Sequence, residues 1–182
     1  PAQDHDCLDE FPMAEPFTLK GPEDYNRVVY IDPTASSAGD GASQSAPRRS
    51  FAGIDFQADT AYLLRRGTTD VVREQIFIDQ SDVYIGSYGV GDRPILRGDF
   101  PHDQNALQSW SNGLRILFTD IYDVSIDAVW LGNVDFAEIA YSHIYRSNQA
   151  WYPGADQDDT ARGDAIQFSY GVRNFWVHHN NL

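Results

Sequence analysis

The chain has 182 residues, 27 of them acidic and 13 basic, which gives a formal net charge of -14 at pH 7. This length suits one well-buried core and is short for two ordinary domains, and the acidic surface argues against nucleic acid as a partner, because it would repel a phosphate backbone. No apolar run is long enough for a membrane-spanning helix, and the single cysteine, Cys7, excludes an intramolecular disulfide.

The first part of the chain predicts an extended lead-in or cap over residues 1–27, which are rich in Pro, Asp and Glu and show no sustained period of 2 or 3.6 residues. Residues 28–31 predict the first strand, and the Pro-, Ser-, Ala- and Gly-rich stretch 32–49 predicts a long loop. The best helical candidate, 51–58, is short. Because the chain starts at Pro1 without methionine, we expect a secreted or periplasmic protein that has lost a signal peptide, with proteolysis as the alternative origin of this start.

Short apolar alternations then recur to the end of the chain, each closed within a few residues by Asp, Asn, Ser or Gly. They come in four pairs: 76–78 with 83–85, 116–118 with 124–126, 129–131 with 139–141, and 166–168 with 175–177. Stacked coils produce this pattern, because each coil buries its apolar side chains only against its neighbours. The sequence therefore predicts an all-β fold, a parallel β-helix over 28–182. In the last two pairs the aligned positions are Val129 with Ile166, Leu131 with Phe168, and Ile139 with Val177.

An antiparallel β-sandwich built from the same short strands is the alternative fold. A sandwich would require hairpin signals between its strands, and the one good example, Asn112-Gly113, precedes only one of the pairs. The chain closes at Leu182 on what reads as a strand end, which would leave a coil without a neighbour. We therefore expect the remainder of the same β-helix to lie beyond Leu182.

The last 21 residues, 162–182, carry a resemblance to a known superfamily and read RGDAIQFSYGVRNFWVHHNNL. They resemble the stretch of pectate-lyase-like proteins that reads approximately D-G-D-A-I-x-I, a short turn, then N-V-W-V-D-H-N-x-L. A weaker similarity links residues 29–33 and 61–68 to the entry segment of secreted β-helix polysaccharide lyases. The resemblance implies a right-handed parallel β-helix that cleaves uronic-acid polymers by β-elimination, commonly with calcium held by acidic residues on one sheet.

The family motif maps onto this chain with two departures. The second acid of D-G-D, which binds calcium in the family, falls on Asp164, whereas the first acid falls on Arg162. The acid of W-V-D-H falls on His178. These departures indicate a relative with altered substrate or metal use, and the resemblance places the catalytic base, usually an Arg or Lys on a later coil, beyond Leu182.

An acidic loop before the last pair provides candidate calcium ligands. Residues 156–164 contain four carboxylates, among them Asp159 and Asp164, and calcium takes several oxygen ligands at once and can bridge an acidic protein to an acidic polymer. The loop lacks EF-hand spacing, and a solvated acidic loop without an ion is the alternative. Strict alternation would turn Asp164 inward, so its use as a ligand requires a bend, which Gly163 could supply.

Alternation along 175–177 predicts two outward-facing side chains. If Phe175 and Val177 face inward, Trp176 and His178 face outward and His179 faces inward. Trp176 is then a candidate for stacking on a sugar ring, and His178 is a candidate acid, base or carboxylate contact. The alternative is that Trp176 packs under a loop and His178 is solvated.

The insertion between the third and fourth pairs adds further candidates, because the inserted loops of a solenoid tend to gather on its binding face. Trp151 and Tyr152 are expected to border a saccharide groove, and Gln167 is expected to contact the saccharide. Arg146 and Arg162, at the two ends of the insertion, are the nearby cations for a uronate, and Arg162 is a candidate catalytic residue with His178.

The function expected from these observations is a polysaccharide lyase that cleaves an acidic polymer such as alginate or pectate. One alternative is a glycoside hydrolase on the same scaffold, for which Asp120, Asp123 and Asp127 are the candidate carboxylates. The other is a carbohydrate-binding or adhesion module without catalysis.

Overall fold

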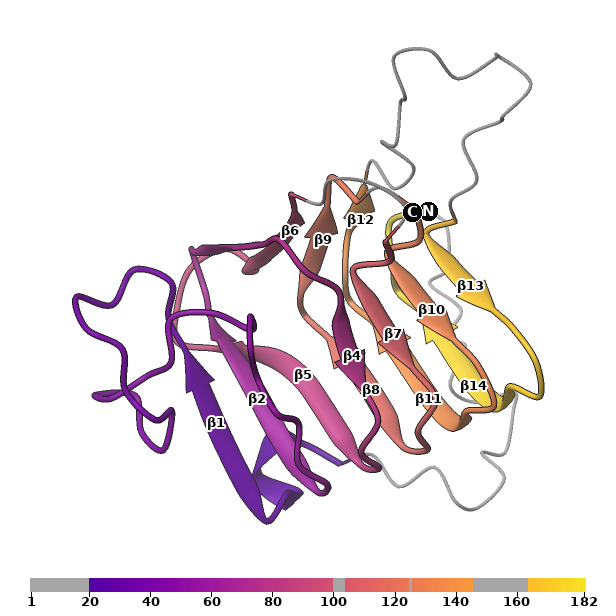
Figure 1. Ribbon diagram of the computed structural model, residues 1–182, viewed down its shortest axis with the longest axis horizontal. Helices are drawn as coiled ribbons and strands as arrows, with labels where there is room; N and C mark the ends of the chain where they lie inside the picture. The colour runs from indigo at the N-terminus through magenta and orange to yellow at the C-terminus, as the bar shows by residue number, and fades with distance from the viewer. Residues whose placement is uncertain (1–19, 100–103, 125, 146–163) are drawn as a thin grey trace, which may run out of the picture.

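The computed structural model of the protein describes residues 20–99, 104–124, 126–145 and 164–182 (Figure 1). Within them the chain forms short strands and one 3-10 helix, in this order: η1 (Pro22–Asp24), β1 (Arg27–Ile31), β2 (Thr60–Arg65), β3 (Thr69–Val72), β4 (Ile76–Ile78), β5 (Val83–Tyr88), β6 (Ile95–Gly98), β7 (Leu107–Ser109), β8 (Leu114–Leu117), β9 (Asp120–Tyr122), β10 (Val129–Leu131), β11 (Asp135–Ala140), β12 (Ile144–Tyr145), β13 (Ile166–Phe168) and β14 (Arg173–His178).

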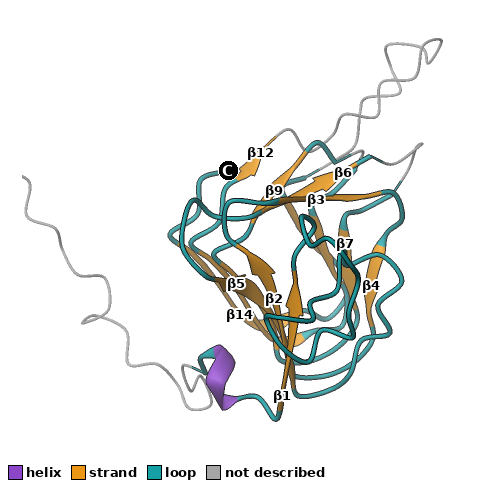
Figure 2. Cartoon of the chain, turned by 90° about the vertical axis from the view of Figure 1, so that its left-hand side faces the viewer, coloured by secondary structure: helices purple, strands orange, loops and turns teal. Residues whose placement is uncertain are grey.

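The strands form three parallel sheets, and each coil of the chain contributes to them in turn. Sheet A has the order β1-β2-β5-β8-β11-β14, sheet B has the order β12-β9-β6-β3, and sheet C has the order β13-β10-β7-β4. In Figure 2 the three sheets surround a shared interior. The predicted parallel β-helix is confirmed, and the antiparallel sandwich is wrong because every strand pair described is parallel.

The register predicted from the sequence is also confirmed. Val129 pairs with Ile166 between β10 and β13, and Ile139 pairs with Val177 between β11 and β14. A one-residue slip would turn every inward side chain of a strand outward, so the buried apolar positions fix this register.

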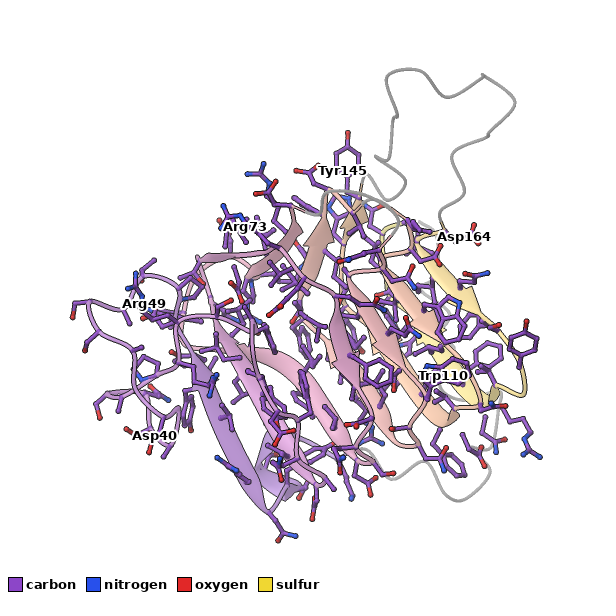
Figure 3. The ribbon with its side chains drawn as sticks, viewed as in Figure 1. Asp40, Arg49, Arg73, Trp110, Tyr145 and Asp164 are labelled. Carbon is purple, nitrogen blue, oxygen red and sulfur yellow. The ribbon has the colours of Figure 1, made fainter. Side chains whose placement is uncertain are left out.

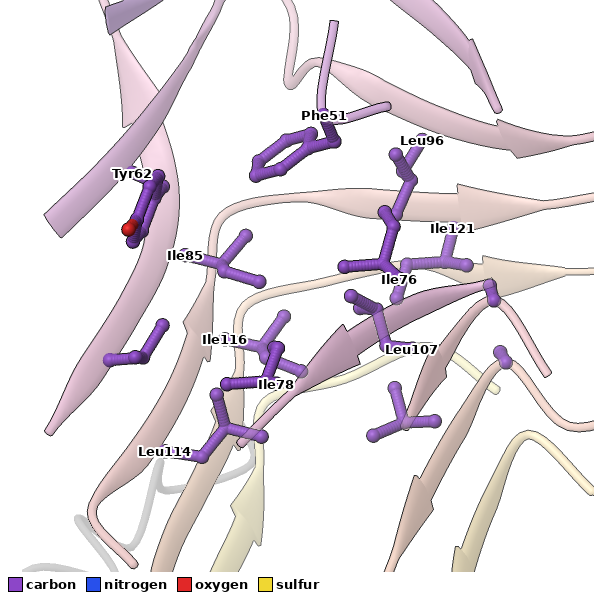
Figure 4. Packing of buried hydrophobic residues seen from close by; sticks show 14 of the residues in the cluster. Phe51, Tyr62, Ile76, Ile78, Ile85, Leu96, Leu107, Leu114, Ile116 and Ile121 are labelled. Atoms are coloured by element: carbon purple, nitrogen blue, oxygen red, sulfur yellow. The ribbon is translucent and has the colours of Figure 1, made fainter. Parts of the chain in front are cut away.

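The core consists of apolar side chains stacked coil upon coil (Figure 4). Along sheet A one inward row runs through Val29, Tyr62, Ile85, Ile116, Ile139 and Val177. Full burial of one such aliphatic side chain contributes about 1.5–3 kcal/mol. Because each row is continuous, every coil depends on its two neighbours for this burial.

The end of the solenoid near β1 is closed by the long loop that the sequence predicts. The loop returns to β1 through a parallel bridge between Ile31 and Arg48, and the segment that follows it inserts Phe51 and Phe56 into the core. Segment 51–58, the best helical candidate, forms no helix. Its backbone is instead held by the buried Asp70 carboxylate on β3, which accepts the Phe51 N–H at 2.7 Å.

In the described residues four coils contain a third strand that the sequence reading missed, because the pairs of alternations are parts of triplets. Sheet B supplies this strand, as β3, β6, β9 and β12. The strand predicted over 124–126 is wrong: Val124 and Ile126 lie in the connection between β9 and β10, and Val124 is buried in the core.

The outer face of sheet A carries a second apolar cluster, formed by Tyr25, Ala61, Leu63, Tyr84, Leu117 and Ala140. Tyr25 follows η1, and its ring lies 5.6 Å from that of Tyr84. The side chains after η1 therefore pack on this face. Burial raises the pKa of Tyr25 and Tyr84 to about 12, so both phenols stay neutral in this layer.

Candidate functional site

Sheet C presents a row of aromatic and amide side chains to the outside. In β4, β7 and β10 the first and third residues are buried, so the middle residue faces outward, and β13 follows in register. The four middle residues are in register and are Phe77, Gln108, Trp130 and Gln167. Gln75 adds a further amide beside this row, because its side chain donates a hydrogen bond to that of Gln108.

Two tryptophans form the centre of this surface. Trp110, which follows β7, contacts Trp130 on β10 with ring centroids 4.6 Å apart and planes inclined by 57°. Gly132 makes room for both, because a Cβ there would lie 2.5 Å from the Trp130 ring and 2.9 Å from the Trp110 ring. Trp110 is 40% exposed and Phe77 is 47% exposed, so aromatic faces on this sheet are open to solvent.

Two carboxylates lie where the strands of sheet C begin. Asn105, Asp127 and Asp164 occupy equivalent positions on three successive coils: Asn105 Oδ1 accepts the Asp127 N–H at 3.2 Å, and Asp127 Oδ1 accepts the Asp164 N–H at 2.7 Å. Figure 3 shows Trp110 against sheet C and Asp164 beside the start of β13. The outward row and the carboxylates therefore belong to one surface, which we call the sheet C face.

The two carboxylates have different surroundings. Asp127 is 3% exposed, and this burial raises the pKa of its carboxyl; the Asp164 N–H works against the increase, and the Asp164 charge adds to it. Asp164 is exposed. The raised pKa lets the Asp127 carboxyl hold its proton at a higher pH than an ordinary aspartate does.

Two site residues predicted from the sequence, Asp164 and Gln167, lie on the sheet C face. Asp164 is exposed just before β13, as its use as a ligand requires. Trp176 and His178 face outward as predicted, but from β14 on sheet A, so they are on a different side of the solenoid. Five further candidates lie outside the described residues: Arg146, Trp151, Tyr152, Asp159 and Arg162.

On sheet A, His178 belongs to a network of charged groups. Its Nε2 lies 3.1 Å from Glu138 Oε1, and Arg115 Nε lies 3.2 Å from Glu138 Oε2. Glu138 is 3% exposed, and the Trp176 ring stacks on that of His178 at 3.7 Å. The alternative of a simply solvated His178 does not hold, because His178 is paired with Glu138.

Two other orientations on β14 differ from simple alternation. Phe175 pairs in register with the buried Ala137, on the inward side as predicted, but it is 50% exposed in the last described coil, where it stacks on Phe168. The inward prediction for His179 is wrong: its φ of 52° turns the chain, and the side chain is exposed. A left-handed residue at the strand end breaks the alternation.

Comparison with known proteins gives one informative likeness. No family model and no curated protein matches the sequence. Among solved structures, the crystal structure of a GH136 lacto-N-biosidase from Eubacterium ramulus, as its selenomethionine derivative, matches with a TM-score of 0.58 and 14% identity over 85% of this chain. The likeness is one of fold. The chain spans 34% of the length of that protein.

The described part of the chain does not contain a complete set of calcium ligands. There, no group of three or more His, Cys, Asp or Glu side chains is placed to hold a metal ion. Calcium takes about six to eight oxygen ligands, so Asp127 and Asp164 alone do not make a site, and Asp159 lies outside the described residues. Calcium therefore stays a prediction, and no chemical step below depends on it.

The sequence reading missed the aromatic residues of the sheet C face. Phe77 and Trp130 are the middle residues of short strands, and that position was the available signal. Trp110 directly follows β7 and carried no such signal. Among the described residues, no helix is both long and apolar enough to span a bilayer.

Proposed function

We propose that this chain is part of a carbohydrate-active β-helix enzyme that binds a polysaccharide across the sheet C face. The observation that carries the proposal is the row of Phe77, Gln108, Trp130 and Gln167 with Trp110 against it. Aromatic faces offer apolar surface to the C–H groups of a sugar ring, and side-chain amides both donate to and accept from its hydroxyls. Because the row runs along the solenoid axis, it suits an extended chain of sugar units.

The chemistry that this face supports best is glycoside hydrolysis by Asp127 and Asp164. Asp127 Oδ1 accepts the Asp164 N–H, which leaves Oδ2 to carry a proton, and the raised pKa favours that proton. In this scheme Asp127 protonates the leaving oxygen and Asp164 attacks the anomeric carbon. Neighbouring coils are about 4.8 Å apart, near the separation of about 5–5.5 Å between the two carboxyls of retaining glycosidases.

The likeness to the lacto-N-biosidase supports a role on carbohydrates, since that protein combines this fold with action on a saccharide. It leaves the substrate open at 14% identity. The substrate of the present chain is therefore proposed only as a polysaccharide.

A second candidate is the β-elimination of an acidic polysaccharide by a secreted lyase, favoured by the exposed Asp164 at the position where the pectate-lyase-like motif holds calcium. Removal of the C5 proton of a uronate requires neutralisation of its carboxylate. His178 lies on sheet A and Asp164 beside sheet C, so a lyase using Asp164 would require a base other than His178.

The two chemistries are separated by their products. The protein is incubated with neutral polysaccharides and with alginate and pectate, with calcium or with a chelator. We expect new reducing ends without ultraviolet absorbance, because hydrolysis creates no double bond. A rise in ultraviolet absorbance that the chelator abolishes would instead establish the lyase, and binding without either product would leave a binding module.

The binding face is tested with two matched tryptophan variants. Trp130→Ala is expected to weaken polysaccharide binding by roughly tenfold, or about 1.4 kcal/mol, because it removes the central ring of the sheet C face, whereas Trp176→Ala on sheet A should leave the affinity unchanged. Affinity electrophoresis or calorimetry measures both. The opposite result, with Trp176→Ala weakening binding and Trp130→Ala neutral, would move the site to sheet A.

A further inference from the structure

We propose that the outer side of sheet B is a second saccharide-binding surface, which takes a polysaccharide that carries carboxylates. Arg73, Arg93, Arg97 and Tyr122 form this surface, which we call the sheet B face. Figure 3 shows Arg73 and Tyr145 projecting from the side of the molecule where Figure 1 labels β6, β9 and β12. Sheets B and C are separate, so binding on the sheet B face is independent of the hydrolysis proposed for the sheet C face.

A row of outward side chains crosses sheet B along the solenoid axis. Val71 on β3 pairs in register with Arg97 on β6, and Arg97 pairs with Tyr122 on β9. The adjacent strand positions Leu96 and Ile121 are buried in the core, so the row faces away from it. Its members are about 4.8 Å apart from coil to coil, which suits an extended chain of sugar units along the axis.

Each of the three arginines is held by an aspartate of the next coil through the same atom. Nε lies 2.7–3.2 Å from a carboxylate oxygen in the pairs Arg73 with Asp99, Arg93 with Asp120, and Arg97 with Asp123. Nε supplies a single N–H, and the two terminal nitrogens carry the other donors of the guanidinium. All three arginines are exposed, so these donors can reach a ligand.

This arrangement suits a carboxylate from outside the chain. The terminal nitrogens of a guanidinium form a planar fork that matches the two oxygens of a carboxylate. Because the aspartates already hold the arginines, a ligand immobilises few side-chain rotamers when it binds. The aspartates also offset the arginine charges, so binding relies on directed hydrogen bonds between charged groups, and added salt should weaken it.

Tyr122 supplies the apolar part of the sheet B face. Its hydroxyl lies 3.1 Å from His143 Nδ1, and the two rings meet edge to face with centroids 5.5 Å apart, which holds the phenol in place. An aromatic ring offers apolar surface to the C–H groups of a sugar. Arg97 and Tyr122 are neighbours in the row, so one uronate unit can meet the first with its carboxylate and the second with its ring.

The charges of the two faces favour different ligands. The sheet C face carries the carboxyl groups of Asp127 and Asp164, which repel a uronate when they are ionised. The sheet B face presents arginine donors instead. A polymer rich in carboxylates is therefore favoured on sheet B.

The proposal is tested by affinity electrophoresis of the full chain with polygalacturonate. Arg97→Gln is expected to weaken binding roughly tenfold, because it removes a charge-assisted pair of hydrogen bonds. Arg65→Gln is the matched control: the Arg65 side chain is 52% exposed, against 53% for Arg97, and it pairs with Asp32 on the sheet A side. Equal affinity in the parent and in Arg97→Gln would overturn the proposal.

A second measurement uses the unmodified protein and does not depend on the folding of a variant. Titration with trigalacturonate should shift the nuclear magnetic resonance signals of the Tyr122 ring and leave those of Trp130 in place, and the methyl-esterified trisaccharide should shift Tyr122 much less. Unshifted Tyr122 signals, or equal shifts with both trisaccharides, would contradict a carboxylate site on sheet B. Loss of hydrolysis in Trp130→Ala bears on the sheet C face alone, so the two proposals fail separately.

Discussion

Gly132 is the residue on which the contact between Trp110 and Trp130 depends, because any Cβ there meets both rings. Gly132→Ala should push the rings apart and weaken polysaccharide binding roughly five- to tenfold, or about 1–1.4 kcal/mol. The melting temperature should change little, because Trp110 is 40% exposed and can move. Affinity electrophoresis measures the first effect and a thermal melt the second.

The control for this prediction is Gly21→Ala, where the atoms nearest to the new Cβ belong to the flexible side chain of Glu23. Gly21 adjoins η1 and the outer side of sheet A, so its substitution should not alter binding. Unchanged affinity in Gly132→Ala would show that the geometry of the two rings does not matter to the ligand.

At the same scale, the sequence predicted which side chains face outward but not where they gather. Trp176 and Trp130 both face outward, and the sequence reveals this because successive side chains of a strand alternate between its two faces. Alternation does not say which of three sheets a strand joins. Asp164 and Gln167 were therefore grouped with His178 and Trp176, although the two groups lie on different sides of the solenoid.

The corner between sheets A and B is held by a ladder of polar side chains that links successive coils. Asn180 Oδ1 accepts the Ser142 N–H at 3.0 Å, Asn180 Nδ2 donates to the Ile139 carbonyl at 2.7 Å, and Ser142 Oγ accepts the Thr119 N–H at 3.3 Å. These bonds satisfy backbone groups at a bend, where no strand partner reaches them.

Asn180→Ala is therefore expected to destabilise the fold by about 1–3 kcal/mol, the cost of leaving buried polar groups without partners. Urea unfolding measures the change. Gln80→Ala is the control, since this half-buried residue donates an exposed hydrogen bond to its neighbour Asp79, and its effect should stay within about 0.5 kcal/mol. Equal small effects in both variants would mean that water replaces the ladder.

The elements were predictable where a strand carries two inward apolar residues, as in β4, β10 and β13, and unpredictable on sheet B. β9 reads Asp-Ile-Tyr and β12 contains two residues, so each offers one inward residue, Ile121 or Ile144. One apolar residue between polar ones has no period to detect. These strands form because the strands of neighbouring coils pair with their backbone N–H and C=O groups.

At the scale of the whole molecule, stability is tied to pH by carboxyl groups that folding shifts in opposite directions. Burial raises the pKa of Asp70 and of Asp127. For Asp32 burial also acts to raise the pKa, but hydrogen bonds from Thr34 and the Arg65 guanidinium outweigh it, and the pKa is lowered. The unfolded reference for all three is an aspartate pKa of about 4.

The sign follows from which state binds the proton more tightly. Asp70 and Asp127 bind their protons more tightly in the folded chain than in the unfolded chain. Their contribution to stability therefore falls as the pH rises from about 4 through their raised pKa values. Folded Asp32 holds its proton less tightly, so its contribution is present above about pH 4 and is lost as the pH falls through its lowered pKa. The net charge of -14 adds self-repulsion at neutral pH, which again favours weakly acidic conditions.

We therefore expect the free energy of unfolding to be greater just above pH 4 than at pH 7. Asp70→Asn isolates one contribution, because the amide oxygen still accepts the Phe51 N–H and the amide nitrogen donates to the Ser50 hydroxyl, yet the group no longer titrates. Urea unfolding across this range should give a flatter dependence on pH for the variant than for the parent. Parallel curves would show that Asp70 titrates alike in the folded and unfolded chains, and the acidic optimum would then rest on Asp127 and on net charge.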